Sequence, residues 1–169
     1  MRLRSPVTRM MLVAAMAAVL EAAKFALNAI PNVELISLLL MVFTSCFGWM
    51  ESLKAALLFA AIECLWWGIS IWTIPYFYIW GILVLISSRL NSSVSIVFRS
   101  IVLGLFGLLF GLLCTPATLI TAGLNAAVSW WIAGIPFDLV HGVSNFILCL
   151  LLYKPLVNAL SRIIKKPEE

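Results

Sequence analysis

Polar and ionisable side chains recur at helical spacing inside three strongly apolar segments of this chain. They are spaced so that the members of each set share one face of a helix. The three sets are Glu21, Lys24 and Asn28; Asp138, His141 and Asn145; and Glu63 with Trp66, Trp67 and Ser70. Because ionisable groups inside apolar helices are costly and usually functional, these stripes are the first candidates for a binding site.

The charge balance of the three stripes indicates what a ligand would have to offer. Three of the side chains are carboxylic acids, and only Lys24 carries a positive charge. A dry site does not hold that excess of negative charge, so either a carboxyl is protonated or the ligand supplies donors or positive charge. Trp66 and Trp67 would suit stacking on a flat ring or a cation. Alternatively, Glu21 and Lys24 form an ion pair and the stripes lock the helices together through hydrogen bonds.

The residues give no support for catalysis or metal binding. His141 is the single histidine of the chain and shares a face with Asp138, but zinc needs more strong ligands than these two. Ser144 does not lie on that face, so a serine–histidine–aspartate arrangement is unsupported. No Gly-x-x-x-x-Gly-Lys-Ser/Thr run is present for binding ATP. We therefore expect no catalytic residue, no metal and no cofactor in this chain.

The elements that must position the stripes are membrane-spanning helices. Hydrophobic residues make up 64% of the chain and charged residues 11%, whereas soluble domains have about 45–50% and about 25%. The mean hydropathy is +1.13 and the pI is about 9.1. This composition excludes a soluble enzyme, a disordered chain and a nucleic-acid-binding domain. The scattered cysteines are expected to be reduced and buried; they are Cys46, Cys64, Cys114 and Cys149.

We predict an all-α integral membrane bundle of six transmembrane helices in a single domain, 1–169. The spans are 7–30, 35–47, 53–72, 75–87, 94–113 and 137–153, the last continuing to 164. A less regular stretch, 114–131, follows the fifth span. Pro31, Pro75 and Pro136 are expected at span boundaries, because proline cannot donate a helix hydrogen bond. The outer loops are then 28–34, 72–78 and 130–136.

The basic residues predict the orientation of the bundle. With six spans, ten of the 11 lysines and arginines lie on one side, which places both termini in the cytoplasm. At a rise of 1.5 Å per residue, Glu21 and Glu63 lie about 13 Å from the outer helix ends and Lys24 about 9 Å. The stripes then form a pocket that opens outward, and not a pore. A cleaved signal peptide is the alternative for the first segment, although its removal would leave an odd number of spans.

Two sets of small residues predict close helix approach. Ala14, Ala18 and Ala22 form a small-xxx-small stripe on the first helix, away from its polar face. Such a stripe serves either packing inside the bundle or docking of a partner subunit. A second set in the fifth span predicts close packing there; its members are Gly104, Gly107 and Gly111.

The chain resembles the substrate-binding S components of energy-coupling factor (ECF) vitamin transporters. The resemblance rests on six short spans, a basic cytoplasmic side, an outward polar pocket and the alanine stripe. Residues 28–35 (NAIPNVEL) are similar to the first outer loop of such proteins. Residues 134–146 (GIPFDLVHGVSNF), followed by Lys154-Pro155-Leu156, are similar to their sixth helix.

The resemblance implies a binding subunit with no catalysis of its own, in the cell membrane of a bacterium. It would capture a water-soluble vitamin or related micronutrient and dock on a membrane coupling subunit through Ala14, Ala18 and Ala22. Two cytoplasmic ATPase subunits would use the ATP. Family members take riboflavin, thiamine, folate, biotin, cobalamin and others, so either a flat nitrogen-bearing ring or a corrinoid is possible. The alternative is a self-sufficient protein, either a small proton-coupled carrier or an intramembrane enzyme.

Overall fold

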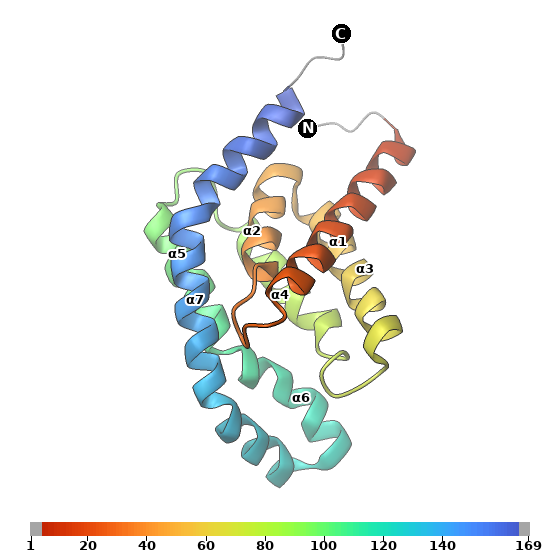
Figure 1. Cartoon of the computed structure of the whole chain (residues 1–169), viewed down its shortest axis with the longest axis vertical. Helices are drawn as coiled ribbons and strands as arrows, with labels where there is room; N and C mark the ends of the chain where they lie inside the picture. Colours follow the sequence, from red (N-terminus) through yellow and green to blue (C-terminus); the bar gives the residue numbers. More distant parts are fainter. Residues whose placement is uncertain (1–4, 166–169) are drawn as a thin grey trace.

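The computed structural model describes residues 5–165, and within them every regular element is a helix and there is no strand. The helices are α1 (Pro6–Leu27), α2 (Ile36–Phe47), α3 (Trp49–Trp67), α4 (Tyr76–Ser88), α5 (Ile96–Leu108), α6 (Phe110–Ala122) and α7 (Leu124–Lys165). The chain direction alternates along the long axis, with α5 and α6 running in the same sense (Figure 1). The start of α1 and the end of α7 lie at the same end of the molecule. The all-α prediction is confirmed.

Local chemistry fixes several of the helix ends. The Ser5 hydroxyl accepts a hydrogen bond from the Thr8 amide at 3.1 Å and so caps α1, with Pro6 at the first helical position. Ser95 caps α5 in the same way through the amide of Phe98, at 3.2 Å. Gly48 separates α2 from α3 with a φ of 90°, a conformation that glycine adopts without steric cost.

The core of the molecule is built around α2. Every residue from Ile36 to Thr44 is buried. Helices α1, α3, α4 and α7 all contact α2. A helix that is apolar all round is stable only when protein or lipid covers it on every side. In α2 the neighbouring helices provide that cover over 36–44.

The close packing predicted for the fifth span is confirmed at the contact between α5 and α7. A Cβ atom added to Gly107 would lie 2.9 Å from the Cα atom of Gly142. One added to Gly104 would lie 3.3 Å from the carbonyl oxygen of Gly142. The two backbones approach each other so closely that only glycine fits at Gly107.

The predicted third outer loop, 130–136, is wrong, because these residues lie inside α7. The irregular stretch expected over 114–131 is also mostly helical, in α6 and the start of α7. Pro31 and Pro75 lie between helices as predicted, but Pro136 is interior to α7. A proline inside a helix removes one hydrogen bond and bends the helix without necessarily ending it. The actual break is Gly123, with a φ of 83°.

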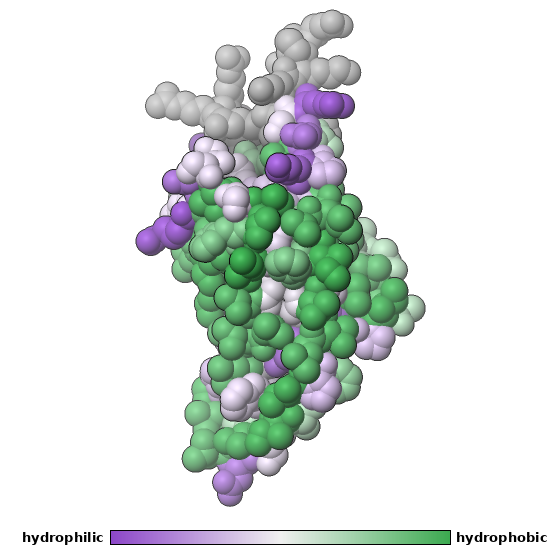
Figure 2. Space-filling model, turned by 90° about the vertical axis from the view of Figure 1, so that its left-hand side faces the viewer, coloured by the Kyte–Doolittle hydropathy of each residue, from purple (hydrophilic) through white to green (hydrophobic). Residues whose placement is uncertain are grey.

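The surface is compatible with a membrane protein. Three helical segments are long and apolar enough to cross a membrane: Pro6–Leu27, Ile96–Ala122 and Leu124–Arg162. Helices α2 and α4 are apolar but shorter. Figure 2 shows a mostly hydrophobic face, with hydrophilic residues gathered toward the end where α1 starts and α7 ends.

Candidate functional site

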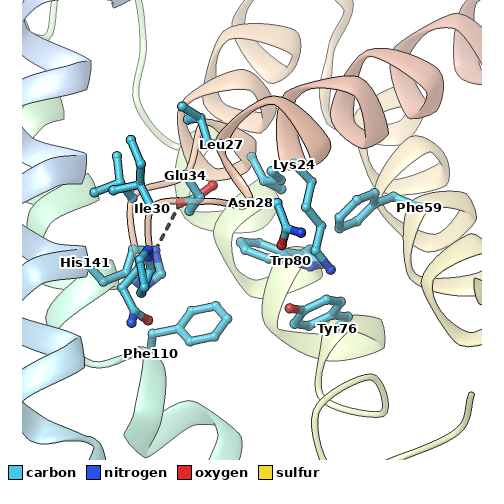
Figure 3. Close-up of a pocket in the computed structure, with 14 residues that line it drawn as sticks. Lys24, Leu27, Asn28, Ile30, Glu34, Phe59, Tyr76, Trp80, Phe110 and His141 are labelled. Atoms are coloured by element: carbon cyan, nitrogen blue, oxygen red, sulfur yellow. Dashed lines mark hydrogen bonds and ion pairs between the residues drawn. The ribbon is translucent and has the colours of Figure 1, made fainter. Parts of the chain in front are cut away.

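A partly enclosed cavity of about 210 Å³ lies between the C-terminal end of α1 and the other helices (Figure 3). The segment 28–35, which joins α1 to α2, forms one side of it. Its polar lining comes from Lys24, Asn28, Asn32, Glu34, Tyr76 and His141. The cavity therefore combines residues from both ends of the sequence.

An ion pair closes one end of the cavity. The ammonium of Lys24 donates a hydrogen bond to the carboxylate of Glu63 on α3. The Glu63 side chain is 1% exposed and that of Lys24 is 27% exposed. Lys24 Nζ also lies 5.2 Å from the centre of the Tyr76 ring, within the range of a cation–π contact. Lys24 thus has Glu63 as its partner, and not the Glu21 of its own helix.

A second polar pair lies at the other end, where the segment 28–35 meets α7. Glu34 Oε1 lies 3.0 Å from Nε2 of His141. Glu34 Oε2 accepts a hydrogen bond from the Ser37 amide at 2.9 Å, which caps the first turn of α2. The Ser144 hydroxyl donates to the carbonyl of Asn32 at 3.2 Å. These contacts fix the segment 28–35 against α7.

Glu34 is held in its ionised form. Burial alone would raise the pKa of this carboxyl. The hydrogen bonds from His141 and Ser37, together with the charge of His141, outweigh burial and lower the pKa below its ordinary value. The pair therefore presents a carboxylate to the cavity.

An aromatic wall joins the two polar pairs. It consists of Phe59, Tyr76, Trp80, Phe110 and His141, from four different helices, and all five side chains line the cavity. Phe59 stacks on Tyr76 with 6.1 Å between ring centres. The ring centres of Tyr76 and Trp80 lie 5.5 Å apart, those of Trp80 and Phe110 5.4 Å, and those of Phe110 and His141 4.8 Å. In Figure 3, Tyr76 and Phe110 lie below Asn28 and Glu34, and Phe59 lies to the right of Lys24. Such a surface suits one face of a flat ring.

The structure brings only some of the predicted site residues together. Lys24, Asn28 and His141 line the cavity, and Glu63 is joined to it through Lys24. The remaining ones do not line it; they are Glu21, Trp66, Trp67, Asp138 and Asn145. Local contacts explain this for Trp66, Trp67 and Asp138.

Trp66 and Trp67 are the last two residues of α3 and are 66% and 55% exposed. Helix α3 ends at Trp67, with Gly68 as the residue after it, so Ser70 lies outside the helix and the predicted stripe is cut short. Trp66 instead makes an edge-on contact with Phe25, with 5.6 Å between ring centres. The tryptophan that lines the cavity is Trp80.

Asp138 has a structural role in α6. Both oxygens of its carboxylate accept from the amide of Gly111, at 3.0 and 3.2 Å. Since Leu109 gives α6 no side-chain cap, Asp138 caps this helix from α7. Asn145 is fully buried, and neither polar atom of its amide has a hydrogen-bond partner among residues 5–165. Oε1 of Glu21 is also buried without a hydrogen-bond partner among these residues.

Sequence reasoning did not select Glu34, Tyr76, Trp80 and Phe110 for the site. The sequence does distinguish Glu34, because it is the only charged residue within 28–35. Tyr76 belongs to the segment predicted as the second outer loop. Trp80 and Phe110 carry no such signal, because only packing distinguishes them from other aromatic residues of apolar helices.

The alanine stripe lies on the surface. Ala14, Ala18 and Ala22 are all exposed, so packing inside the chain does not account for them. All four cysteines are free; two are buried and two are half-buried. Within 5–165, no group of three His, Cys, Asp or Glu side chains is arranged to hold a metal ion.

Comparison with known proteins gives no match: no family model, no curated protein and no solved structure is similar to this chain. Any function must therefore be argued from the cavity itself.

Proposed function

We propose that this chain is the substrate-capture subunit, or S component, of an ECF-type importer in a bacterial cell membrane. It would cross the membrane six times, with α5 and α6 forming one span and both termini in the cytoplasm. The alternating helix directions support this topology, as does the common end at which α1 starts and α7 ends. The resemblance of 28–35 and 134–146 to that family is the other support.

The observation that carries the proposal is the aromatic wall with a polar pair at each end. A flat ring lying on the wall would meet donors from Lys24 and Asn28 at one end. At the other end it would meet the carboxylate of Glu34. Charge-assisted hydrogen bonds of this kind are worth about 1.5–3 kcal/mol each. The expected ligand is therefore a water-soluble vitamin or related micronutrient with a flat, nitrogen-bearing ring.

The size of the cavity favours such a ring over a corrinoid. Its volume is about 210 Å³, below the roughly 300–1,000 Å³ of most small-molecule pockets. A corrinoid would require the whole segment 28–35 to leave its contacts with His141 and Ser144. A small ring needs only a modest movement of that segment.

Release of the ligand to the cytoplasm would need partner subunits. The buried helix α2 closes the inner side of the cavity, since Ile36 lines it and the residues that follow are all buried. The proposed partners are a membrane coupling subunit, docked on Ala14, Ala18 and Ala22, and two cytoplasmic ATPase subunits. ATP would be used by those subunits and not by this chain.

Ligand identification is the direct test. The purified protein should retain a small molecule that mass spectrometry can identify, and titration with riboflavin, thiamine, folate and biotin should find saturable binding. Tyr76→Ala should weaken that binding roughly tenfold or more, because it removes the centre of the wall. Trp66→Ala, on an exposed tryptophan, is the matched control. Binding that is lost in Trp66→Ala and kept in Tyr76→Ala would contradict the assignment of the cavity.

The partner proposal has a separate test. Ala18→Trp places a bulky side chain on the stripe and should abolish co-purification with coupling and ATPase subunits while leaving ligand affinity unchanged. A substitution on another exposed position of the same helix, Val19→Trp, serves as the control. If ligand binding persists but no partner is ever captured, the chain is a self-sufficient carrier.

A further inference from the structure

A second polar cavity, of about 430 Å³, lies at the end of the bundle opposite the aromatic wall. It is formed where α2 and α4 end and α5 begins, with α7 on one side; Figure 1 shows these helix ends in its upper half. Its polar lining consists of Thr44, Ser45, Ser87, Ser88, Asn91, Ser92, Arg99, Tyr153 and Lys154. We call it the inner cavity. It shares no lining residue with the first cavity.

Arg99 is a buried cation that has no acidic partner among residues 5–165. Its side chain lines the inner cavity, and the residue is only 4% exposed. One guanidinium nitrogen donates to the carbonyls of Leu90 and Asn91, which holds the segment between α4 and α5. The other terminal nitrogen, Nη1, is buried and has no hydrogen-bond partner among residues 5–165. No carboxylate within that range forms an ion pair with Arg99.

Residues with hydroxyl groups line the same cavity as this guanidinium. The Ser87 hydroxyl is buried and, like Nη1 of Arg99, has no partner among the described residues. The Ser45 and Tyr153 hydroxyls lie 2.8 Å apart, and the Arg99 guanidinium lies 5.0 Å from the centre of the Tyr153 ring. Lys154 adds a second positive charge to the lining, which includes no acidic residue from the part of the chain that the structure describes.

We propose that the inner cavity binds a phosphate-type oxyanion, either a free phosphate group or the headgroup of an anionic phospholipid. A buried charge without a counter-charge is costly, and a bound anion would remove that cost. Arginine and hydroxyl donors together are suited to phosphate oxygens. Apolar residues at the same cavity, Leu90, Ile96 and Val157, would tolerate the first carbons of a lipid chain. The proposal is independent of the vitamin site.

Two arms of one experiment distinguish the sources of the anion. In the first, inorganic phosphate is titrated into the full-length protein in phosphatidylcholine nanodiscs, against chloride at equal ionic strength. In the second, nanodiscs of phosphatidylcholine alone are compared with nanodiscs that also contain phosphatidylglycerol. The melting temperature is followed in both arms. A rise with phosphate indicates a free phosphate group, and a rise only with phosphatidylglycerol indicates a lipid headgroup.

Three variants test the site itself. Arg99→Gln should weaken the saturable response roughly tenfold or more, and Ser87→Ala should weaken it several-fold. Arg89→Gln removes an exposed positive charge at the same end of the molecule, outside the cavity lining, and should change nothing. If Arg99→Gln does not fold, the response of Ser87→Ala decides whether the cavity binds the anion. No response in either arm, or an equal loss in Arg89→Gln, would overturn the proposal.

Discussion

At the scale of single residues, the ammonium of Lys24 has two kinds of neighbour. It pairs with the buried carboxylate of Glu63 and lies close to the faces of Tyr76 and Phe59. The first contact stabilises the fold, and the second places the charge beside the wall where a ring would lie. The two roles can be separated by experiment.

We predict that Lys24→Met destabilises the protein, because it leaves the Glu63 carboxylate buried and unpaired. Breaking a buried pair costs about 3–5 kcal/mol, and here less, since Lys24 is 27% exposed. The double variant Lys24→Met with Glu63→Met should recover the melting temperature, because both charges are gone. It should still bind the vitamin roughly tenfold to a hundredfold more weakly.

The comparison variant for this series is Lys54→Met, which breaks a pair within α3 between Lys54, 55% exposed, and Glu51, 9% exposed. Because solvent screens the more exposed Lys54, the melting temperature should fall less than in Lys24→Met, and ligand affinity should not change. Full ligand affinity in the double variant would show that Lys24 serves the fold alone.

A pH dependence follows from Glu34, whose pKa is lowered by His141 and Ser37 against the effect of burial. A carboxyl with a lowered folded pKa stabilises the protein above its unfolded pKa, and that stabilisation is lost as the pH falls through the folded value. We predict that the melting temperature falls on acidification below about pH 4. In Glu34→Gln this acid-induced fall should be smaller. An identical acid profile in the variant would contradict the assignment.

At the scale of elements, the junction of α5, α6 and α7 depends on one carboxylate. Asp138 caps α6 through the amide of Gly111, and a Cβ atom on Gly111 would collide with that carboxylate. We predict that Asp138→Ala and Gly111→Ala each lower the free energy of unfolding by about 0.5–2 kcal/mol. The double variant should cost little more than either single one, because both remove the same contact.

Gly134→Ala is the matched control within α7. A Cβ atom there meets nothing within 4 Å, so the higher helix propensity of alanine should leave stability unchanged or raise it by up to about 1 kcal/mol. Denaturant unfolding in one detergent measures all four variants. Additive losses for Asp138 and Gly111 would mean that the two residues act separately.

These elements also show what spacing along a helix can and cannot predict. The spacing of Asp138, His141 and Asn145 placed them correctly on one face of α7. It could not predict their partners, because His141 meets the segment 28–35 whereas Asp138 meets the start of α6. The partner of each side chain is set by where neighbouring helices begin and end. These positions depend on how the helices pack, which spacing along one helix does not predict. Trp80 and Phe110 were not identified from the sequence for the same reason.

At the scale of the whole molecule, hydropathy predicted a helical bundle with alternating chain direction, and the basic residues predicted an orientation. The prolines were less informative, since Pro136 bends α7 where a loop was expected. The short second segment, predicted as a span, lies buried at the centre of the bundle. The composition of this segment could not show whether lipid or the other helices cover its apolar surface.

Accessibility of single cysteines tests the proposed orientation in the membrane. In a variant without the four native cysteines, Ser92→Cys lies between α4 and α5, and Asn125→Cys lies near the junction of α6 and α7; both positions are exposed. An impermeant thiol reagent applied to intact cells should label Asn125→Cys. It should label Ser92→Cys only after the membrane is opened. Labelling of both positions in intact cells would contradict six spans with cytoplasmic termini.

The position of α2 between the two cavities has an electrical consequence. Ile36, in its first turn, lines one cavity, and Thr44 and Ser45, in its last turn, line the other. In the proposed membrane topology, and if solvent enters both cavities, the membrane potential would fall mainly across this helix, about 18 Å long, and not across the full hydrocarbon thickness of about 30 Å. The electric field is then strongest along α2, which has no charged residue on which the field could act. The bundle can thus hold charged groups at both ends of α2 without coupling its conformation to the voltage.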